Sequence, residues 1–193
     1  MQIFDCAQGS PEWFQCRMGI PTASEFATCM ASGRGGGDSK TCRTYMLKLA
    51  GEILTGRPTE NYSNGFMERG HEQEPDARSK YAFLANVEPQ IVGFIRRGDK
   101  GALEIKSKAA HLQIDLLDRD EFPPEHRAQC QGVLWVAERE WIDLACYCPD
   151  LPLFVKREYR DDLYIRKMAE SVRIFNEELA ELVAKIRAMQ EAA

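Results

Sequence analysis

Histidine is scarce in this chain of 193 residues, which has only three, and its seven cysteines include no C-x-x-C pair. Zinc sites depend on clustered cysteine and histidine ligands, so no zinc centre is expected. The odd number and wide scatter of the cysteines indicate reduced thiols rather than a disulfide framework. We therefore expect a protein of a reducing compartment.

Long apolar runs are also lacking. No run reaches the roughly 18 residues that a membrane-spanning helix needs. The first residues, MQIFDCAQGSPEW, lack the basic and apolar regions of a secretory signal, so a cytoplasmic protein is expected. The net charge of −5 argues against a uniformly basic surface for nucleic acid. Local basic clusters remain, such as Arg96 with Arg97 and Lys106 with Lys108.

The residues that are present suit one globular domain over 1–193, since 44% are hydrophobic and 28% are charged. Apolar periodicity, caps and prolines predict both helices and strands. The expected helices cover 21–31, 39–56, 64–85, 123–140 and a long amphipathic segment from about 161; the expected strands cover 88–97, 101–106, 141–148 and 151–159. This order predicts an α/β fold in which helices flank a central, mostly short-stranded sheet.

Three local questions stay open at this level. Either Thr22 or Ser24 can cap the helix at 21–31. Pro75 either begins a second helix within 64–85 or bends a single one. The last segment has apolar residues at alternating steps of four and three, a stripe that either packs on the domain or contacts another subunit. These residues are Met168, Val172, Phe175, Leu179, Leu182, Ile186 and Met189.

The triplet Glu104-Ile105-Lys106 lies in the predicted strand 101–106. Alternation along a strand places Glu104 and Lys106 on the same face. Carboxylate oxygens are preferred ligands of Mg²⁺, and a neighbouring lysine can orient a water or neutralise charge on a phosphate. The triplet therefore suits metal-assisted hydrolysis of a phosphodiester, although an isolated surface pair of this kind is usually structural.

Further motifs accompany this triplet along the chain. In order they are SPEWFQCRMGIPTASEF, GHEQEPDAR, GALEIKSK, PPEHRAQCQGVLWVAEREW and YCPDLPLFVKR. Together they resemble the YqaJ-type viral recombinases, the lambda-type exonuclease family of the PD-(D/E)XK nuclease superfamily. The resemblance covers about residues 8 to 165. It implies a restriction-endonuclease-like core.

The resemblance also implies an activity and its partners. Members of this family degrade one strand of double-stranded DNA from the 5′ end, using Mg²⁺, for which Mn²⁺ is a possible substitute. They leave 3′ single-stranded overhangs for a single-strand annealing protein in phage or prophage recombination. They form ring-shaped trimers, so a homo-oligomer that works on DNA ends in the bacterial host cytoplasm is expected.

Candidate site residues follow from matching the family's motifs to this chain. The metal-binding carboxylates match Glu74 and Glu104, and the catalytic lysine matches Lys106. Gln129 matches a glutamine close to the active centre. Two residues match the family's contacts to the 5′ phosphate of the DNA: Arg17 and Ser24.

One family feature is missing, namely a serine-proline-aspartate-glycine stretch about ten residues before the E-x-K glutamate. Here GFIRRGDKGALEIK runs directly into the triplet. If Gly101-Ala102 formed a type II′ turn, Asp99 would face Glu104 and could replace the missing metal ligand. Otherwise Asp99 is a solvent-facing turn residue. Two hypotheses follow: a metal-dependent exonuclease, or a weakened or inactive relative that binds DNA ends.

Overall fold

The computed structural model of the chain describes residues 6, 9–33, 39–59, 65–89 and 101–192. Their contacts group into two compact units. Unit 1 contains Met1–Glu60 and Asp161–Ala193, and unit 2 contains Asn61–Arg160. The single domain over 1–193 stays a prediction.

Unit 1 is helical. It contains α1 (Pro11–Arg17), the short 3₁₀ helix η1 (Ala23–Glu25), α2 (Phe26–Cys29), α3 (Lys40–Thr55) and α7 (Asp162–Glu191). The predicted helix at 39–56 is confirmed as α3. The helix begins where the Ser39 hydroxyl accepts from the Cys42 N–H, and it ends at Gly56, which has φ 65°. The predicted helix at 21–31 is divided between η1 and α2. Thr22 is the N-cap of η1 but makes no capping bond through its side chain.

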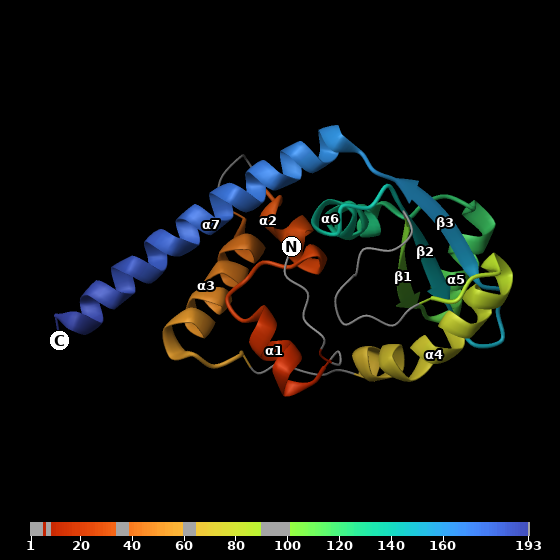
Figure 1. The fold of residues 1–193 in the computed structure, drawn as a ribbon, viewed down its shortest axis with the longest axis horizontal. Helices are drawn as coiled ribbons and strands as arrows, with labels where there is room; N and C mark the ends of the chain where they lie inside the picture. The colour runs from red at the N-terminus through yellow and green to blue at the C-terminus, as the bar shows by residue number, and fades with distance from the viewer. Residues whose placement is uncertain (1–5, 7–8, 34–38, 60–64, 90–100, 193) are drawn as a thin grey trace. The chain divides into compact units, whose positions relative to one another are not determined.

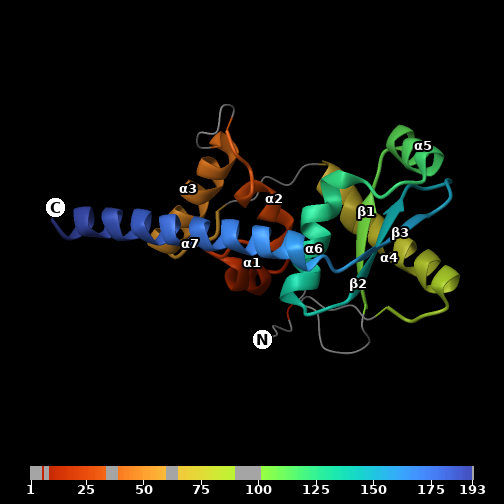
Figure 2. The same cartoon turned by 90° about the horizontal axis from the view of Figure 1, so that it is seen from above.

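Helix α7 lies alongside α2 and α3 (Figure 2). Its buried residues are Ile165, Met168, Val172, Phe175, Leu179 and Val183. The Phe175 ring stacks on Tyr45 of α3 with centroids 5.5 Å apart. Beyond Leu179 the buried face leaves the predicted stripe, because Val183 is buried in place of Leu182 and Met189 is 54% exposed. A straight helix has 3.6 residues per turn, so its buried face drifts away from a strict 3.5-residue repeat. Contact of this part of the stripe with another subunit stays a prediction.

Unit 2 is built around a three-stranded mixed sheet in the order β1-β2-β3 (Figure 1). Strand β1 (Gly101–Ser107) pairs parallel with β2 (Trp141–Tyr147), which pairs antiparallel with β3 (Phe154–Tyr159). The helices of this unit are α4 (Gly65–Ala85), α5 (Ala110–Arg119), the 3₁₀ helix η2 (Pro124–His126) and α6 (Arg127–Val136). The α/β fold class is therefore confirmed.

The two faces of this sheet carry different helices. Ile142 and Leu144 of β2 join the apolar core with Leu116 of α5 and Leu134 of α6. Between them along the strand, Asp143 points to the opposite face, where it accepts a hydrogen bond from Tyr81 of α4 at 2.7 Å. Alternation therefore assigns one sheet face to α5 and α6 and the other to α4.

Strand 101–106 is confirmed as β1, so Gly101 and Ala102 do not form the type II′ turn that would place Asp99 opposite Glu104. Both residues lie in β1, paired with Trp141 and Ile142 of β2. A Cβ atom at position 101 would lie 2.2 Å from the Trp141 ring, so close packing rather than a turn requires glycine there. The predicted strand 88–97 lies almost wholly outside the described residues, and so does Asp99.

Two further elements differ from or refine the sequence predictions. Pro75 lies inside a single helix, α4, rather than at the start of a second one. Helix α5 follows β1 and was not predicted. It belongs to the crossover that joins the parallel strands β1 and β2, a connection that requires a segment of at least a dozen residues.

Candidate active site

The cluster around Glu104 is the centre of the candidate active site. On β1, Glu104 Oε1 forms an ion pair with Lys106 Nζ at 2.9 Å, as strand alternation predicts. Gln129 Nε2 of α6 donates to the same oxygen at 2.6 Å. The side chains of Glu104 and Lys106 are 20% and 29% exposed. The structure therefore brings together three of the predicted site residues on the α5–α6 face of the sheet.

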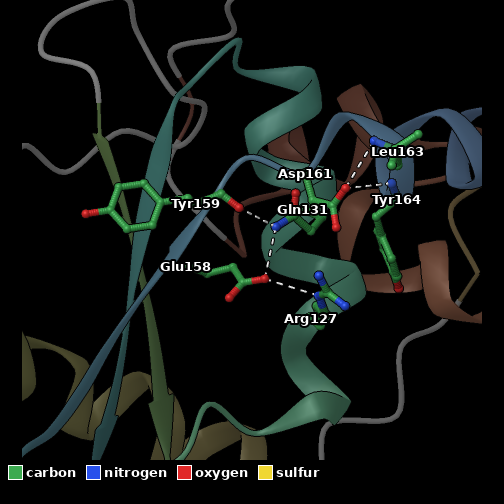
Figure 3. A network of polar contacts seen from close by, with 7 residues as sticks. All are labelled: Arg127, Gln131, Glu158, Tyr159, Asp161, Leu163 and Tyr164. Carbon is green, nitrogen blue, oxygen red and sulfur yellow. Dashed lines mark hydrogen bonds and ion pairs between the residues drawn. The ribbon is translucent and has the colours of Figure 1, made fainter.

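A second polar network fixes α6, and with it Gln129, against β3 (Figure 3). Glu158 of β3 accepts from Arg127 Nε at 3.1 Å and from Gln131 Nε2 at 3.2 Å. The buried Gln131 amide also donates to the Tyr159 carbonyl at 2.8 Å. Figure 3 also shows the cap of α7, in which Asp161 accepts from two backbone N–H groups. Charged and buried hydrogen bonds of this kind hold a helix in one register.

Glu74 lies on α4, three residues before Ala77 and seven before Tyr81. These spacings place the three residues on one face of the helix. Tyr81 contacts the sheet face opposite to Glu104, through Asp143. The Glu74 carboxylate forms an ion pair with Arg78. Among the described residues no hydrogen bond or ion pair joins Glu74 to Glu104, and the role of Glu74 as a metal ligand stays a prediction.

Lys108 and His126 extend the cluster beyond the predicted residues. Lys108 Nζ lies 2.8 Å from His126 Nε2. Burial, followed by the charges of Lys108 and Lys106, lowers the pKa of His126 to about 4. The histidine is therefore neutral at neutral and alkaline pH, and its ring nitrogen accepts from the lysine.

Arg17 and Ser24 lie close together in unit 1. Arg17 donates to the Thr22 hydroxyl at 3.0 Å, and the Thr22 and Ser24 hydroxyl oxygens are 3.1 Å apart. The guanidinium also lies 4.0 Å from the centroid of the Trp13 ring. Burial lowers the pKa of Arg17, while the neighbouring Tyr45 and Glu25 oppose this effect. A planar cation beside two hydroxyl groups suits a phosphate.

A buried glutamate holds the turn between Arg17 and Thr22. Glu52 of α3 accepts from the Gly19 N–H at 2.8 Å and from the Thr59 N–H at 3.2 Å. Gly19 has φ 71°, and a Cβ atom there would lie 2.5 Å from Ile53 Cγ1. The turn therefore requires glycine for its backbone conformation and for its contact with α3.

The donor chemistry of the cluster fits a divalent ion such as Mg²⁺. Both contacts of the Glu104 carboxylate fall on Oε1, and Oε2 accepts no hydrogen bond from a described residue. Mg²⁺ commonly takes one or two carboxylates and completes its coordination with water and phosphate oxygens. Within the described ranges, no three His, Cys, Asp or Glu side chains gather in a way that could hold an ion. Asp99 lies outside those ranges.

Comparison with known proteins identifies the family. The profile of the YqaJ-like viral recombinase domain matches residues 12–96. An alkaline exonuclease from Laribacter hongkongensis, LHK-Exo, is 30% identical, with a TM-score of 0.80 over 95% of this chain and 100% of that one. Its complex with dAMP gives the same identity and coverage and a TM-score of 0.81. A search of curated proteins gave no match.

The fold is shared more widely. A phage-related exonuclease from Haemophilus somnus 129PT aligns with a TM-score of 0.63 at 13% identity, over 86% of this chain and 95% of that one. The chain thus has the PD-(D/E)XK-like α/β fold of these exonucleases. It belongs to the YqaJ-like viral recombinase family, whose relatives here are alkaline exonucleases of the lambda type. Among the residues that the structure describes, no helix is long and apolar enough to cross a membrane.

Sequence reasoning missed Thr22, Glu52, His126 and the role of Lys108 in the cluster. Thr22 was considered only as a helix cap, whereas it links Arg17 to Ser24. Lys108 carried a usable signal, because it continues the alternation of Glu104 and Lys106 on β1. No comparable pattern identifies Glu52, whose bond to Gly19 joins residues 33 positions apart.

Proposed function

We propose that this protein is a Mg²⁺-dependent 5′-to-3′ exonuclease that degrades one strand of linear double-stranded DNA. The observation that carries the proposal is the convergence of Glu104, Lys106 and Gln129 on one face of the sheet. Its support is an ammonium group and an amide that each lie within hydrogen-bond distance of the same carboxylate oxygen. The relative LHK-Exo, which is named an alkaline exonuclease and was also solved in complex with dAMP, supports a nucleotide-releasing activity.

In this proposal each residue has a separate task. Glu104 holds the metal ion through its carboxylate, and Glu74 and Asp99 are the candidates for further ligands. Bound Mg²⁺ supplies Lewis-acid polarisation of the phosphate and lowers the pKa of a bound water. Lys106 orients the attacking water and neutralises charge that develops on the phosphate. Gln129 positions the Glu104 carboxylate by donating to Oε1.

Arg17 and Ser24 are proposed to bind the terminal 5′ phosphate of the DNA strand. Their support is the hydrogen-bonded chain from the guanidinium through Thr22 to the Ser24 hydroxyl. A guanidinium provides a planar fork of donors that matches a phosphate group. This contact would select ends that carry a 5′ phosphate.

The wider setting is proposed from the family alone. The 3′ overhangs would serve a single-strand annealing protein in a phage or prophage recombination system. A ring-shaped homotrimer in the cytoplasm of a bacterial host would enclose the DNA. Mn²⁺ would replace Mg²⁺, since both ions accept carboxylate and water ligands.

The test is release of nucleotides from a linear duplex with 5′-phosphorylated ends, with Mg²⁺ and with chelator. Metal-dependent release that proceeds from the 5′ end and is abolished by Lys106→Ala supports the proposal. Lys156→Ala is the matched control, because Lys156 lies on the same face of the sheet but pairs with Asp120 at 2.9 Å. Release without metal, or equal loss in both variants, contradicts the proposal.

The alternative function is binding of DNA ends with little or no cleavage. It is favoured by the missing serine-proline-aspartate-glycine stretch, because losing a metal ligand from a two-metal site impairs catalysis while phosphate contacts persist. Binding of the duplex without metal-dependent release would support it. Insertion of that stretch between Gly98 and Asp99 should then produce a large gain in metal-dependent activity.

A further inference from the structure

Lys108 continues the row of charged side chains that begins at Glu104. The residue directly follows β1, and its N–H donates to the Tyr147 carbonyl at 2.8 Å, so it stays in register with β2. Residues two apart on a strand share a face and lie about 6.8 Å apart. Lys106 and Lys108 therefore lie on one face of the sheet, each with an ammonium group that could meet a phosphate of a nucleic acid strand.

The two ammonium groups differ in their partners. Lys106 is paired with the Glu104 carboxylate at 2.9 Å. Lys108 is 14% exposed and meets His126 Nε2 at 2.8 Å, whereas its carboxylate partner Glu125 lies 3.8 Å away with its side chain 59% exposed. An ammonium group has only donors, so the imidazole must accept and is neutral. The ammonium group of Lys108 is therefore positioned by the neutral imidazole of His126.

A largely buried cation whose carboxylate partner is exposed and 3.8 Å away is only weakly neutralised, so a further anion would stabilise it. Lys156, on the same sheet face, has such a partner in Asp120 at 2.9 Å. The low pKa of His126 keeps the partner of Lys108 neutral across the neutral and alkaline range. The arrangement thus keeps one positive charge available beside the Glu104 cluster.

We propose that Lys108, positioned by His126, binds a backbone phosphate of the DNA strand next to the phosphodiester that is cleaved. This inference rests on the proposed function, namely that unit 2 acts on DNA. The recognised chemistry is the phosphate anion of the strand and carries no sequence information. Lys106 acts at the reacting group, and Lys108 holds the neighbouring nucleotide in register.

The test is equilibrium binding of the full-length protein to a linear 5′-phosphorylated duplex, in chelator, over a range of salt concentrations. Removing one phosphate contact lowers the slope of log K against log salt by about 0.7 to 0.9. Lys108→Gln should show this change and bind roughly five- to eight-fold more weakly at 0.1 M salt. Lys156→Gln, the matched control, should keep the wild-type slope, because its charge is already paired.

Two His126 variants test the positioning role while Lys108 stays in place. His126→Glu supplies a carboxylate to the ammonium group and should reproduce the loss of slope seen in Lys108→Gln. His126→Gln keeps a neutral acceptor and should keep the wild-type slope. Far-ultraviolet circular dichroism of each variant checks that it is folded. If Lys108→Gln is not folded, the two His126 variants still test whether Lys108 binds a phosphate.

The outcomes separate this inference from the proposed function. An unchanged slope in Lys108→Gln, equal losses in Lys108→Gln and Lys156→Gln, or no DNA binding by the wild type would overturn the inference. Equal losses in His126→Glu and His126→Gln would overturn the positioning role. If the wild type binds DNA but releases no nucleotide with Mg²⁺, the exonuclease proposal fails while the slopes still decide the role of Lys108.

Discussion

Glu52 in unit 1 and Glu104 in unit 2 are both carboxylates withdrawn from solvent, and they are engaged in different ways. Glu52 is buried and uses both oxygens to accept from backbone N–H groups, one on Gly19 and one on Thr59. Glu104 is 20% exposed and uses one oxygen to contact two side chains, those of Lys106 and Gln129.

The difference separates a carboxylate whose oxygens both hold the backbone from one that contacts only side chains. Backbone donors cannot leave without unfolding a turn, so both oxygens of Glu52 are committed to the fold. The side-chain partners of Glu104 contact one oxygen, and Oε2 is without a hydrogen bond from the described residues. In unit 2 the side chains around Glu104 form the candidate site itself. In unit 1 Glu52 instead holds the turn between Arg17 and Thr22.

The largest effect is expected from Glu104→Gln. Replacing the proposed metal ligand should lower metal-dependent nucleotide release at least about 100-fold, because an amide binds Mg²⁺ more weakly than a carboxylate. The thermal unfolding midpoint should change little. Gln129→Leu should show a smaller loss of about 10- to 100-fold, since it removes only the positioning hydrogen bond. Nuclease assays and thermal melts of both variants check that Glu104→Gln loses more activity than Gln129→Leu. Equal activity in Glu104→Gln and the wild type would contradict the metal-binding role of Glu104.

Glu52→Gln should affect stability first. The amide nitrogen of glutamine would face a backbone N–H, so one hydrogen bond to the turn is lost, at a cost of about 1–3 kcal/mol in the free energy of unfolding. Urea denaturation measures this change, with the slope against urea unchanged. Stability equal to the wild type would show that water replaces the lost partner.

Gly19→Ala tests the same turn from the other side. The positive φ of 71° disfavours alanine, and the new methyl group would meet Ile53 Cγ1. Overpacking of this kind costs about 1–3 kcal/mol. Gly56→Ala is the matched control, because Gly56 has φ 65° but no atom within 4 Å of the added Cβ. Denaturation of the two variants separates the contact from the backbone strain, and equal losses in both would exclude the contact.

Thr22→Val should have a smaller effect, on substrate choice. Valine keeps the shape of threonine but removes the hydroxyl that links Arg17 to Ser24. Loss of one hydrogen bond of about 1 kcal/mol should reduce the preference for 5′-phosphorylated over 5′-hydroxyl ends about five-fold. The ratio of initial rates on the two duplexes measures this preference. Thr28→Val, which removes a bond to Glu25 at 2.9 Å, is the control and should keep the ratio.

The acid side of the stability profile should depend on His126. Its pKa of about 4 in the folded protein lies below the unfolded value of about 6.5. The unfolded state then binds more protons as the pH falls below about 6.5, so the stability contributed by the neutral ring is present above that pH and is lost towards pH 4. Urea denaturation across this range should show a shallower decline in His126→Gln. Parallel profiles for the two proteins would contradict this.

Part of the fold could be read from local sequence signals. Ser39 and Gly56 lie at the two ends of α3, and alternation on β1 predicted that Glu104 and Lys106 share a face, where they form an ion pair. These features depend on neighbours in the chain. The partner of β1 could not be predicted, because Gly101 suggested a turn although it serves the close approach of Trp141.

Helix α5 escaped prediction for a related reason. Its buried face contains Gln113, which donates to the carbonyls of Cys146 and Pro152, while Leu112 and Ile114 are 46% and 54% exposed. Apolar periodicity locates a helix only where the apolar residues face the core. The hydrogen bond from Gln129 to Glu104 was equally hidden, since it joins residues 25 positions apart.

The parallel pairing of β1 with β2 has a consequence for how the reactive cluster assembles. Glu104, Lys106, His126 and Gln129 all come from the single β1–α5–α6–β2 crossover, residues 101–147. This crossover supplies all four side chains, and Glu158 of β3 holds α6 in place, so the cluster contains no residue from the first sixty or the last thirty. Hydrogen exchange during refolding should therefore protect β1 and β2 together, and mutations in α3 or α7 should change how tightly unit 1 is folded before they disturb this chemistry.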